Sequence, residues 1–259
     1  MCQTNKMLTT PATEEIQRGI QEHEPVILAI ETATRAGSVA VARGEQVLSS
    51  RVGDPDVSHS ANLIELIESA LNEAGKELSN VDFFAAAVGP GSFTGLRIGL
   101  ATVKALASVT NRKIVGVSTL AAIAHATRVE GQLVALLPAG RGEVFAQMFS
   151  VSDGTVMAQD AAAHLSPKET IERYDKESDV RWVGEGVEKL SEFLQSESSS
   201  GTANGSLPLA VSVADLALKD YREGKSVGPN DLHAVYVRAS DAEINERWHQ
   251  QNAQQLARG

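Results

Sequence analysis

The fold is decided by the stretch Val88-Gly89-Pro90-Gly91-Ser92-Phe93-Thr94-Gly95-Leu96-Arg97-Ile98-Gly99-Leu100. An apolar run, residues 83–88, leads into it and is typical of a buried strand. A long apolar helix pattern, residues 95–109, follows it. Glycine admits backbone angles closed to other residues, and proline fixes its own φ, so the residues between these segments favour a sharp change of direction. The sequence predicts a strand, a tight structural elbow and a helix, with the elbow made by Gly89, Pro90, Gly91, Ser92, Thr94 and Gly95.

The elbow admits two functional interpretations. Ser92 or Thr94 can cap the following helix by accepting a hydrogen bond from a free backbone N–H. A glycine-rich turn at a helix N-terminus can also bind an anion. The spacing does not match the two common phosphate loops, because no lysine follows Gly95 and three residues separate it from Gly91. A packing turn and a phosphate site both stay open, with the packing turn favoured.

Composition limits the class of protein. At 259 residues, with 42% apolar and 22% charged residues, the chain resembles a globular protein of one large domain or two lobes. The net charge of −10 argues against a chain that binds nucleic acid unaided, but not against a subunit whose partner contacts RNA. The single cysteine, Cys2, excludes disulfides and thiolate metal cages. No apolar run reaches the roughly 18 residues of a membrane span, and residues 1–24 lack a secretory signal, so we expect a cytoplasmic protein with no membrane contact.

The order of predicted elements favours a duplicated architecture. After a disordered or weakly helical extension, residues 1–24, the pattern of residues 25–118 is that of a first ribonuclease-H-like lobe, an antiparallel meander extended by parallel strands. A related, degenerate order recurs in residues 119–240, and residues 241–259 form a polar, helix-prone tail. We therefore predict an α/β protein of the two-lobed actin-like (ASKHA) class, with mixed sheets flanked by helices. In the second lobe the predicted elements include a strand ending in Gly184-Glu185-Gly186, helices over 187–195 and 211–221, and a last strand over 235–237.

Catalytic residues are hard to find in this sequence. No two histidines have the spacing of a helical metal pair, and no serine lies in a G-x-S-x-G motif, so we predict no catalytic residue and no metal site. Glu31 ends the first strand, where an acidic residue in actin-like ATPases helps to hold a phosphate-bound metal. Arg141 and Glu143 lie in a turn between two strands and are predicted to shape a cleft between the lobes together with Glu31.

Two helices are candidates for a partner interface. Residues 95–109 carry only Arg97 and Lys104 as charged groups, whereas a surface helix normally has a wider polar face. Together with the helix over 61–74, this segment predicts a seam with another subunit; the alternative is that both of its sides are covered by the same chain. The predicted interface residues are Leu63, Ile64, Ile67, Leu71, Leu96, Leu100 and Val103.

Several motifs together resemble the TsaB family, formerly YeaZ. They are Ile27-Leu28-Ala29-Ile30-Glu31-Thr32-Ala33-Thr34, Gly37-Ser38-Val39-Ala40-Val41, the elbow stretch, Gly116-Val117-Ser118-Thr119-Leu120, Arg141-Gly142-Glu143-Val144-Phe145 and Tyr236-Val237-Arg238. The resemblance implies a non-catalytic scaffold subunit of the machinery that makes threonylcarbamoyladenosine next to the tRNA anticodon. It implies as partners a TsaD-type catalytic subunit and a TsaE-type ATPase, a homodimer when the chain is alone, and tRNA reached through the complex. It implies no intrinsic cofactor, with ATP, Mg and a catalytic metal on partner subunits.

The sequence departs from this family at two places. The family usually has Asp where Glu31 stands, and Asp-Ala-Arg where this chain has Pro138-Ala139-Gly140. Both departures argue against intrinsic binding of a metal–nucleotide complex. The alternative function is an ATP-dependent phosphotransferase or ATPase of the actin-like fold, which rests on the duplicated lobes, Glu31 and the elbow. A protease has no support, because the sequence offers no nucleophile or metal set.

Overall fold

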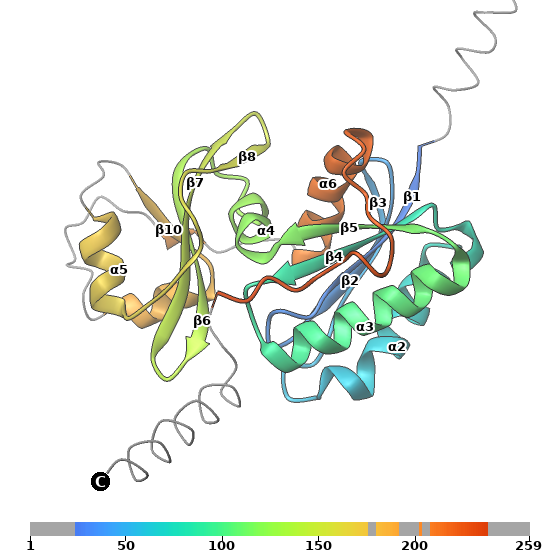
Figure 1. Cartoon of the computed structure of the whole chain (residues 1–259), viewed down its shortest axis with the longest axis horizontal. Coiled ribbons are helices and arrows are strands. Elements are labelled where there is room, and N and C mark those ends of the chain that lie inside the picture. Colours follow the sequence, from blue (N-terminus) through green and yellow to red (C-terminus); the bar gives the residue numbers. More distant parts are fainter. Residues whose placement is uncertain (1–23, 176–179, 192–201, 204–207, 238–259) are drawn as a thin grey trace, which may run out of the picture.

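The chain forms two lobes that lie side by side, each built on one β-sheet (Figure 1). The computed structural model describes residues 24–175, 180–191, 202–203 and 208–237. The predicted tail over 241–259 and, except for Glu24, the predicted extension over 1–24 lie outside the described residues.

The first sheet is a meander extended by parallel strands, as the sequence predicts. Its spatial order is β3-β2-β1-β4-β5, with the first two pairings antiparallel and the last two parallel. The strands are β1 (Val26–Glu31), β2 (Ser38–Arg43), β3 (Gln46–Val52), β4 (Phe83–Gly89) and β5 (Lys113–Ser118). Every residue of β1 and β4 is buried, because helices cover both faces of the sheet, and this explains why these strands are continuous apolar runs.

Two helices cover one face of this sheet. They are α2 (His59–Glu73), with a short 3₁₀ helix η1 (Leu78–Asn80) after it, and α3 (Phe93–Thr110) (Figure 1). Each helix begins at a serine that accepts a backbone N–H of its first turn, Ser58 for α2 and Ser92 for α3. Their inward side chains form one core with the strands.

The second sheet repeats the order of the first. Its spatial order is β11-β10-β6-β7-β8, so β6, β7 and β8 form the meander and β10 and β11 the parallel extension. A further short strand, β9 (Ala163–Leu165), pairs with β7. The elements of this lobe are β6 (Gly131–Gly140), β7 (Glu143–Ser152), β8 (Thr155–Ala158), α5 (Pro167–Tyr174), β10 (Arg181–Val183), the 3₁₀ helix η2 (Glu185–Leu190) and β11 (Thr202–Ala203). The predicted fold class, an α/β fold of two lobes with mixed sheets flanked by helices, is confirmed.

The last helix of each repeat packs against the sheet of the other lobe. After β5, α4 (Thr119–Ala126) packs on β6, β7 and β8; after β11, α6 (Leu209–Arg222) packs on β1, β2, β4 and β5 (Figure 1). The chain then stays with the first lobe, where Val227 pairs with Ile114 and Leu232 enters the first core. The predicted second lobe over 119–240 is therefore corrected, because α6 and the following segment belong to the packing of the first lobe.

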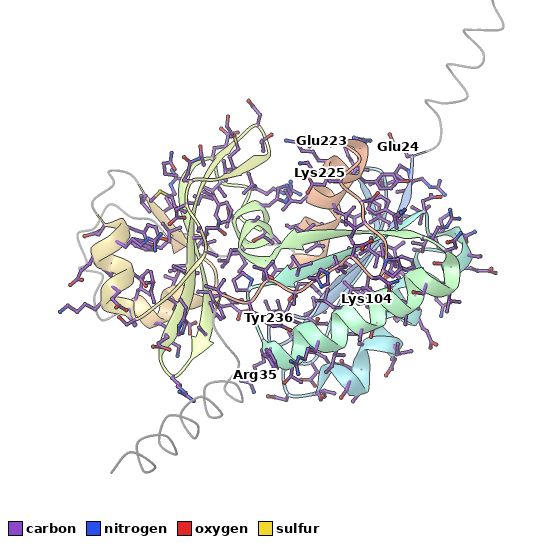
Figure 2. The ribbon with its side chains drawn as sticks, in the orientation of Figure 1. Glu24, Arg35, Lys104, Glu223, Lys225 and Tyr236 are labelled. Carbon is purple, nitrogen blue, oxygen red and sulfur yellow. The ribbon has the colours of Figure 1, made fainter. Side chains whose placement is uncertain are left out.

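Two predicted elements differ in the structure. Residues 235–237 form no strand; they are an extended segment that includes Tyr236 (Figure 2), and the Val235 N–H donates to the Val88 carbonyl at 2.7 Å. The predicted helix over 187–195 begins earlier, as the 3₁₀ helix η2. Among the described residues, none of the helices combines the length and apolar character of a membrane span.

Candidate functional site

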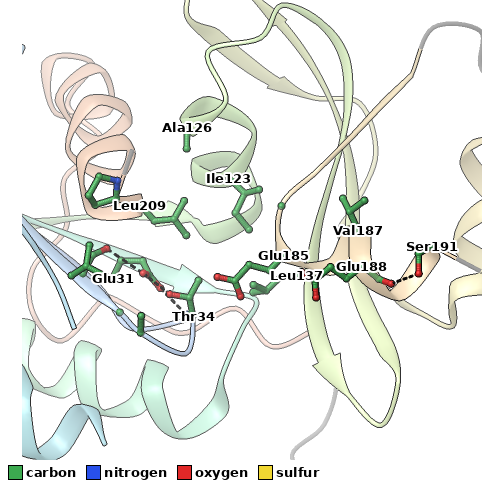
Figure 3. Close-up of a pocket in the computed structure, with 16 residues that line it drawn as sticks. Glu31, Thr34, Ile123, Ala126, Leu137, Glu185, Val187, Glu188, Ser191 and Leu209 are labelled. Atoms are coloured by element: carbon green, nitrogen blue, oxygen red, sulfur yellow. Dashed lines mark hydrogen bonds between the residues drawn. The ribbon is translucent and has the colours of Figure 1, made fainter. Parts of the chain in front are cut away.

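A cleft with a volume of about 500 Å³ opens between the two lobes (Figure 3). Its walls come from the β1–β2 loop, the end of β3, α4, β6, η2 and the start of α6. The lining residues are Glu31, Thr34, Ala36, Gly37, Ser38, Val52, Ile123, Ala126, Leu137, Gly184, Glu185, Val187, Glu188, Ser191, Pro208 and Leu209. Apolar side chains dominate, and the charged groups among them are all carboxylates.

Glu31 lies at the back of this cleft and is buried, with 1% of its surface exposed. Its Oε1 accepts the Thr34 backbone N–H at 2.7 Å, and its Oε2 accepts the hydroxyls of Thr34 at 2.9 Å and Ser38 at 3.3 Å. Burial raises the pKa of Glu31 above its ordinary value, and the hydrogen bonds from Thr34 and Ser38 oppose that rise. The prediction that Glu31 belongs to the cleft is right for its position, but its oxygens are engaged in holding the β1–β2 loop.

Arg141 and Glu143 do not reach this cleft. They flank the turn between β6 and β7, where Arg141 is exposed at a φ of 52°. A carboxylate oxygen of Glu143 lies 2.8 Å from Nε2 of His164 on β9, the strand beside it. The prediction that these two residues shape the cleft is wrong. Leu137 of β6 lines the cleft, but β6 continues past it to Gly140, and the turn that follows is not part of the lining.

The elbow after β4 is a packing device. Ser92 caps α3 by accepting the Gly95 N–H at 3.2 Å, and its own N–H donates to the Ala33 carbonyl at 2.8 Å. A Cβ at Gly91 would lie 2.6 Å from Ala33, and one at Gly95 would overlap the Thr32 carbonyl. The Gly89–Pro90 peptide is cis, and Thr94 is exposed beside the cap. The packing interpretation therefore accounts for this stretch: the loop after β1 occupies the space in front of the elbow.

Most of the predicted interface residues lie inside the protein's own core. Six of the seven are at most 7% exposed, and five of these pack with the strands beneath α2 and α3. The sixth, Leu96, enters the core on the side of α6. The buried residues are Leu63, Ile67, Leu71, Leu96, Leu100 and Val103. These six assignments are corrected, because a side chain already covered by its own sheet cannot form a seam; Ile64 alone of the seven is exposed, at 55%.

The outer surface of these two helices is formed by other residues. On α3 an exposed stripe of Arg97, Ala101, Ala105 and Val109 recurs every four residues. Val109 is 84% exposed. The small size of Ala101 and Ala105 already indicates in the sequence that another helix can approach this side of α3, and both are exposed in the structure, whereas Gly95 and Gly99, which share that small size, are buried.

A second hollow, of about 260 Å³, lies where α2 and α3 begin. Its wall includes Arg35, Asp56, His59, Ser92 and Thr94. Nε2 of His59 lies 3.0 Å from the Thr34 carbonyl, so this histidine holds the β1–β2 loop from the side opposite the cleft. Within the residues that the structure describes, no three His, Cys, Asp or Glu side chains come together as a metal site requires.

Comparisons with known proteins agree with this architecture. The family model described as TsaD, tRNA N6-adenosine threonylcarbamoyltransferase, matches residues 55–223. A tRNA threonylcarbamoyladenosine biosynthesis protein TsaB from Escherichia coli is 32% identical over 220 residues, which are 82% of this chain and 94% of that protein. A tRNA N6-adenosine threonylcarbamoyltransferase from Ehrlichia ruminantium is 37% identical over 112 residues, 38% of this chain and 32% of that enzyme.

A solved structure extends the likeness to three dimensions. YeaZ from Pseudomonas aeruginosa superposes with a TM-score of 0.72 at 29% identity, covering 82% of this chain and 99% of that one. The similarity to proteins named TsaB thus spans nearly their whole length, whereas the similarity to the transferase is confined to a part of it. The chain belongs to the TsaB (YeaZ) family, within the wider family that the TsaD model describes.

Proposed function

We propose that this chain acts in the biosynthesis of threonylcarbamoyladenosine in tRNA, as a non-catalytic subunit that holds a TsaD-type catalytic subunit in its active arrangement. Family membership over most of the chain supports the pathway. The arrangement around Glu31 supports the accessory role. In an actin-like ATPase a carboxylate at this place would face a phosphate-bound metal, whereas Glu31 is buried and accepts three hydrogen bonds from its own loop.

The outer face of α2 and α3 is the proposed contact surface for the catalytic subunit. We define it by the exposed residues Ile64, Arg97, Ala101, Ala105 and Val109. Small side chains at two successive turns of α3 let a partner helix approach closely, and Ile64 and Val109 each offer an apolar side chain. Burying a large aliphatic side chain stabilises an interface by about 1.5–3 kcal/mol, so these residues suffice to anchor one.

The same face supports the other proposed assemblies. The Ehrlichia transferase is similar in sequence to part of this chain. A homodimer of this chain and a heterodimer with such a transferase can therefore use equivalent pairs of helices. The net charge of −10 supports a division of labour in which tRNA is bound through the complex. A TsaE-type ATPase would join this assembly, with ATP, Mg and the catalytic metal held by partner subunits, in the cytoplasm.

Reconstitution of tRNA modification tests this function. A TsaD-type subunit, a TsaE-type ATPase and threonylcarbamoyl-adenylate are incubated with unmodified tRNA, with and without this chain, and modified adenosine is measured by mass spectrometry. We expect modification only when the chain is present, and no ATP turnover by the chain alone with Mg²⁺. Full modification without the chain, or ATP hydrolysis by the isolated chain, would overturn the accessory role.

A further inference from the structure

The cleft between the lobes has the size and composition of a small-molecule site. Its volume of about 500 Å³ lies within the range of about 300–1,000 Å³ that is typical of ligand pockets. Apolar side chains come from four elements: Ile123 of α4, Leu137 of β6, Val187 of η2 and Leu209 of α6 (Figure 3). No residue of α2 or α3 lines the described cleft, so the site is separate from the proposed contact surface.

The backbone of the second lobe is built to place one carboxylate in this cleft. Gly184, at a φ of 95°, and Gly186 lie on either side of Glu185. A Cβ at Gly184 would lie 2.8 Å from Ile123, and one at Gly186 would lie 2.8 Å from Leu136. The two glycines therefore let η2 lie directly on β6 and against α4. Glu185 consequently projects from the wall of the second lobe toward Thr34 of the first (Figure 3).

The charges that line the cleft have one sign. Glu31, Glu185 and Glu188 line it, and its described lining residues include no Lys, Arg or His. Glu31 is occupied by its own loop, whereas the carboxylates of Glu185 and Glu188 are exposed and form no ion pair with a described residue. The described lining therefore offers the phosphates of a nucleotide no basic side chain, and a carboxylate and a phosphate at such separations repel.

We propose that the cleft binds a small organic cation, with a primary ammonium group beside Glu185 and an aliphatic body on the apolar wall. The ammonium group donates hydrogen bonds that a carboxylate accepts, and a hydrogen bond between two charged groups is stronger than one between neutral groups. The apolar wall supplies the remaining affinity through burial of the ligand's carbon chain. Glu188, one turn further along η2, adds a second negative charge for a diamine.

Three ligands that share a carbon chain test the proposal. Hexylamine, hexan-1-ol and hexanoate differ in the charge of the head group and are titrated into the full chain by isothermal calorimetry. We expect saturable binding of hexylamine, binding of hexan-1-ol that is at least about tenfold weaker, and no binding of hexanoate, because only the ammonium group forms a charged hydrogen bond to a carboxylate. Mg²⁺-ATP serves as the nucleotide control and should not bind.

Glu185→Gln isolates the head-group contact. Its side chain is exposed, so the variant should fold, and its affinity for hexylamine should fall about tenfold while that for hexan-1-ol stays unchanged. Glu172→Gln, an exposed glutamate on α5 in the same lobe, is the matched control and should bind hexylamine like the unaltered chain. Val187→Ala should weaken both ligands equally.

Four outcomes would overturn the site. The first is that hexylamine shows no saturable binding at concentrations up to about 10 mM, and the second is that hexanoate binds with the same affinity as hexylamine. The third is that the double variant Glu185→Gln and Glu188→Gln binds hexylamine like the unaltered chain. The fourth is that Mg²⁺-ATP binds in competition with hexylamine. None of these outcomes affects the reconstitution assay, so failure of the site and failure of the proposed function can be distinguished.

Discussion

The side-chain oxygen of Ser38 accepts the backbone N–H of Ala210 at 3.0 Å, although 172 residues separate them in the chain. Ser38 opens β2 and Ala210 lies in the first turn of α6. Helices α2, α3, α4 and α5 each begin at a serine that caps its own helix, but α6 begins at Pro208, whose side chain cannot cap it. Ser38 therefore supplies the cap from the first sheet and fastens α6 to it.

The first prediction concerns this cap. Ser38→Ala leaves the Ala210 N–H buried without a partner, and an unsatisfied buried donor costs about 1–3 kcal/mol. We expect the free energy of unfolding in urea to fall by that amount. Ser108→Ala, on the exposed side of α3, is the control and should change it by less than about 0.5 kcal/mol. An equal, small change in both variants would show that the bond does not hold α6.

The second prediction concerns pH. Because burial raises the pKa of Glu31 in the folded chain, the folded state holds its proton more firmly than the unfolded state does. The stabilising contribution of protonated Glu31 is complete below the unfolded pKa, near 4.5, and is lost as the pH rises through the folded value. Glu31→Gln removes this titration. The unfolding free energy of the unaltered chain minus that of the variant should therefore decrease as the pH rises above the unfolded pKa, near 4.5.

Urea unfolding at several pH values checks this slope. Other carboxylates titrate in both proteins, so their effects cancel in the difference. A difference that stays flat would mean that the hydrogen bonds from Thr34 and Ser38 cancel the effect of burial on the pKa of Glu31. A difference that increases with pH would mean that they outweigh burial and lower that pKa.

Much of the fold follows from the sequence because its signals are local. Apolar runs, capping serines and glycine turns mark the strands and helices of both lobes, and the meander followed by parallel strands gives the sheet order. The sequence holds no such local signal for the sheet on which α6 packs. Its cap lies on Ser38, so only the folded chain shows that α6 leaves the second lobe and covers the first sheet.

The candidate interface was harder to predict for a different physical reason. Helical periodicity tells which residues share a face, but α3 is apolar nearly all round, so periodicity cannot tell which face lies on the sheet. Leu100 is large enough to anchor an interface, but large aliphatic side chains are also the ones most often buried in a core, as Leu100 is here. The residues left outside, Ala101 and Ala105, are small. The cleft could also be predicted only in part. The position of Glu31 at the end of β1 predicts that it lies at the cleft, whereas only the packing of η2 on β6 in the folded chain shows that Glu185 lies there too.

The third prediction tests the contact surface with side chains that the fold does not need. Ile64→Glu and Ala105→Glu place charges on the outer face of α2 and α3, where they should leave the free energy of unfolding within about 0.5 kcal/mol. Binding to a TsaD-type subunit should weaken at least about tenfold for each, because a charge must be desolvated in the interface. Calorimetric titration of the two subunits measures this.

Two further variants control this experiment. Met157→Glu, on an exposed position of β8 in the other lobe, should bind like the unaltered chain. Leu100→Asp is not a test of the surface, because Leu100 is 7% exposed and its replacement should unfold the first lobe. Unaltered affinity of the double variant Ile64→Glu and Ala105→Glu would exclude this face as the interface.

The fourth prediction concerns Gly89, where the segment that follows α6 crosses the elbow. Gly89 has a φ of 116°, and a Cβ there would lie 2.5 Å from the Val235 carbonyl. Gly89→Ala must therefore strain the backbone and also push away the segment whose Val235 N–H donates to Val88. We expect a loss of about 2–5 kcal/mol in the free energy of unfolding, the sum of a positive-φ penalty and an overpacking penalty.

Gly75→Ala separates these two causes. Gly75 follows the C-cap of α2 at a φ of 61°, and nothing lies within 4 Å of its Cβ position, so alanine there suffers only the backbone penalty, about 1–2 kcal/mol. Urea unfolding of both variants gives the difference between their losses of unfolding free energy. Faster hydrogen exchange at the Val235 N–H in Gly89→Ala would show that the additional loss arises at the contact between residues 89 and 235. If Gly89→Ala lost no more stability than Gly75→Ala, the close approach of residue 235 to the elbow would not contribute to holding residues 227–237 on the first lobe.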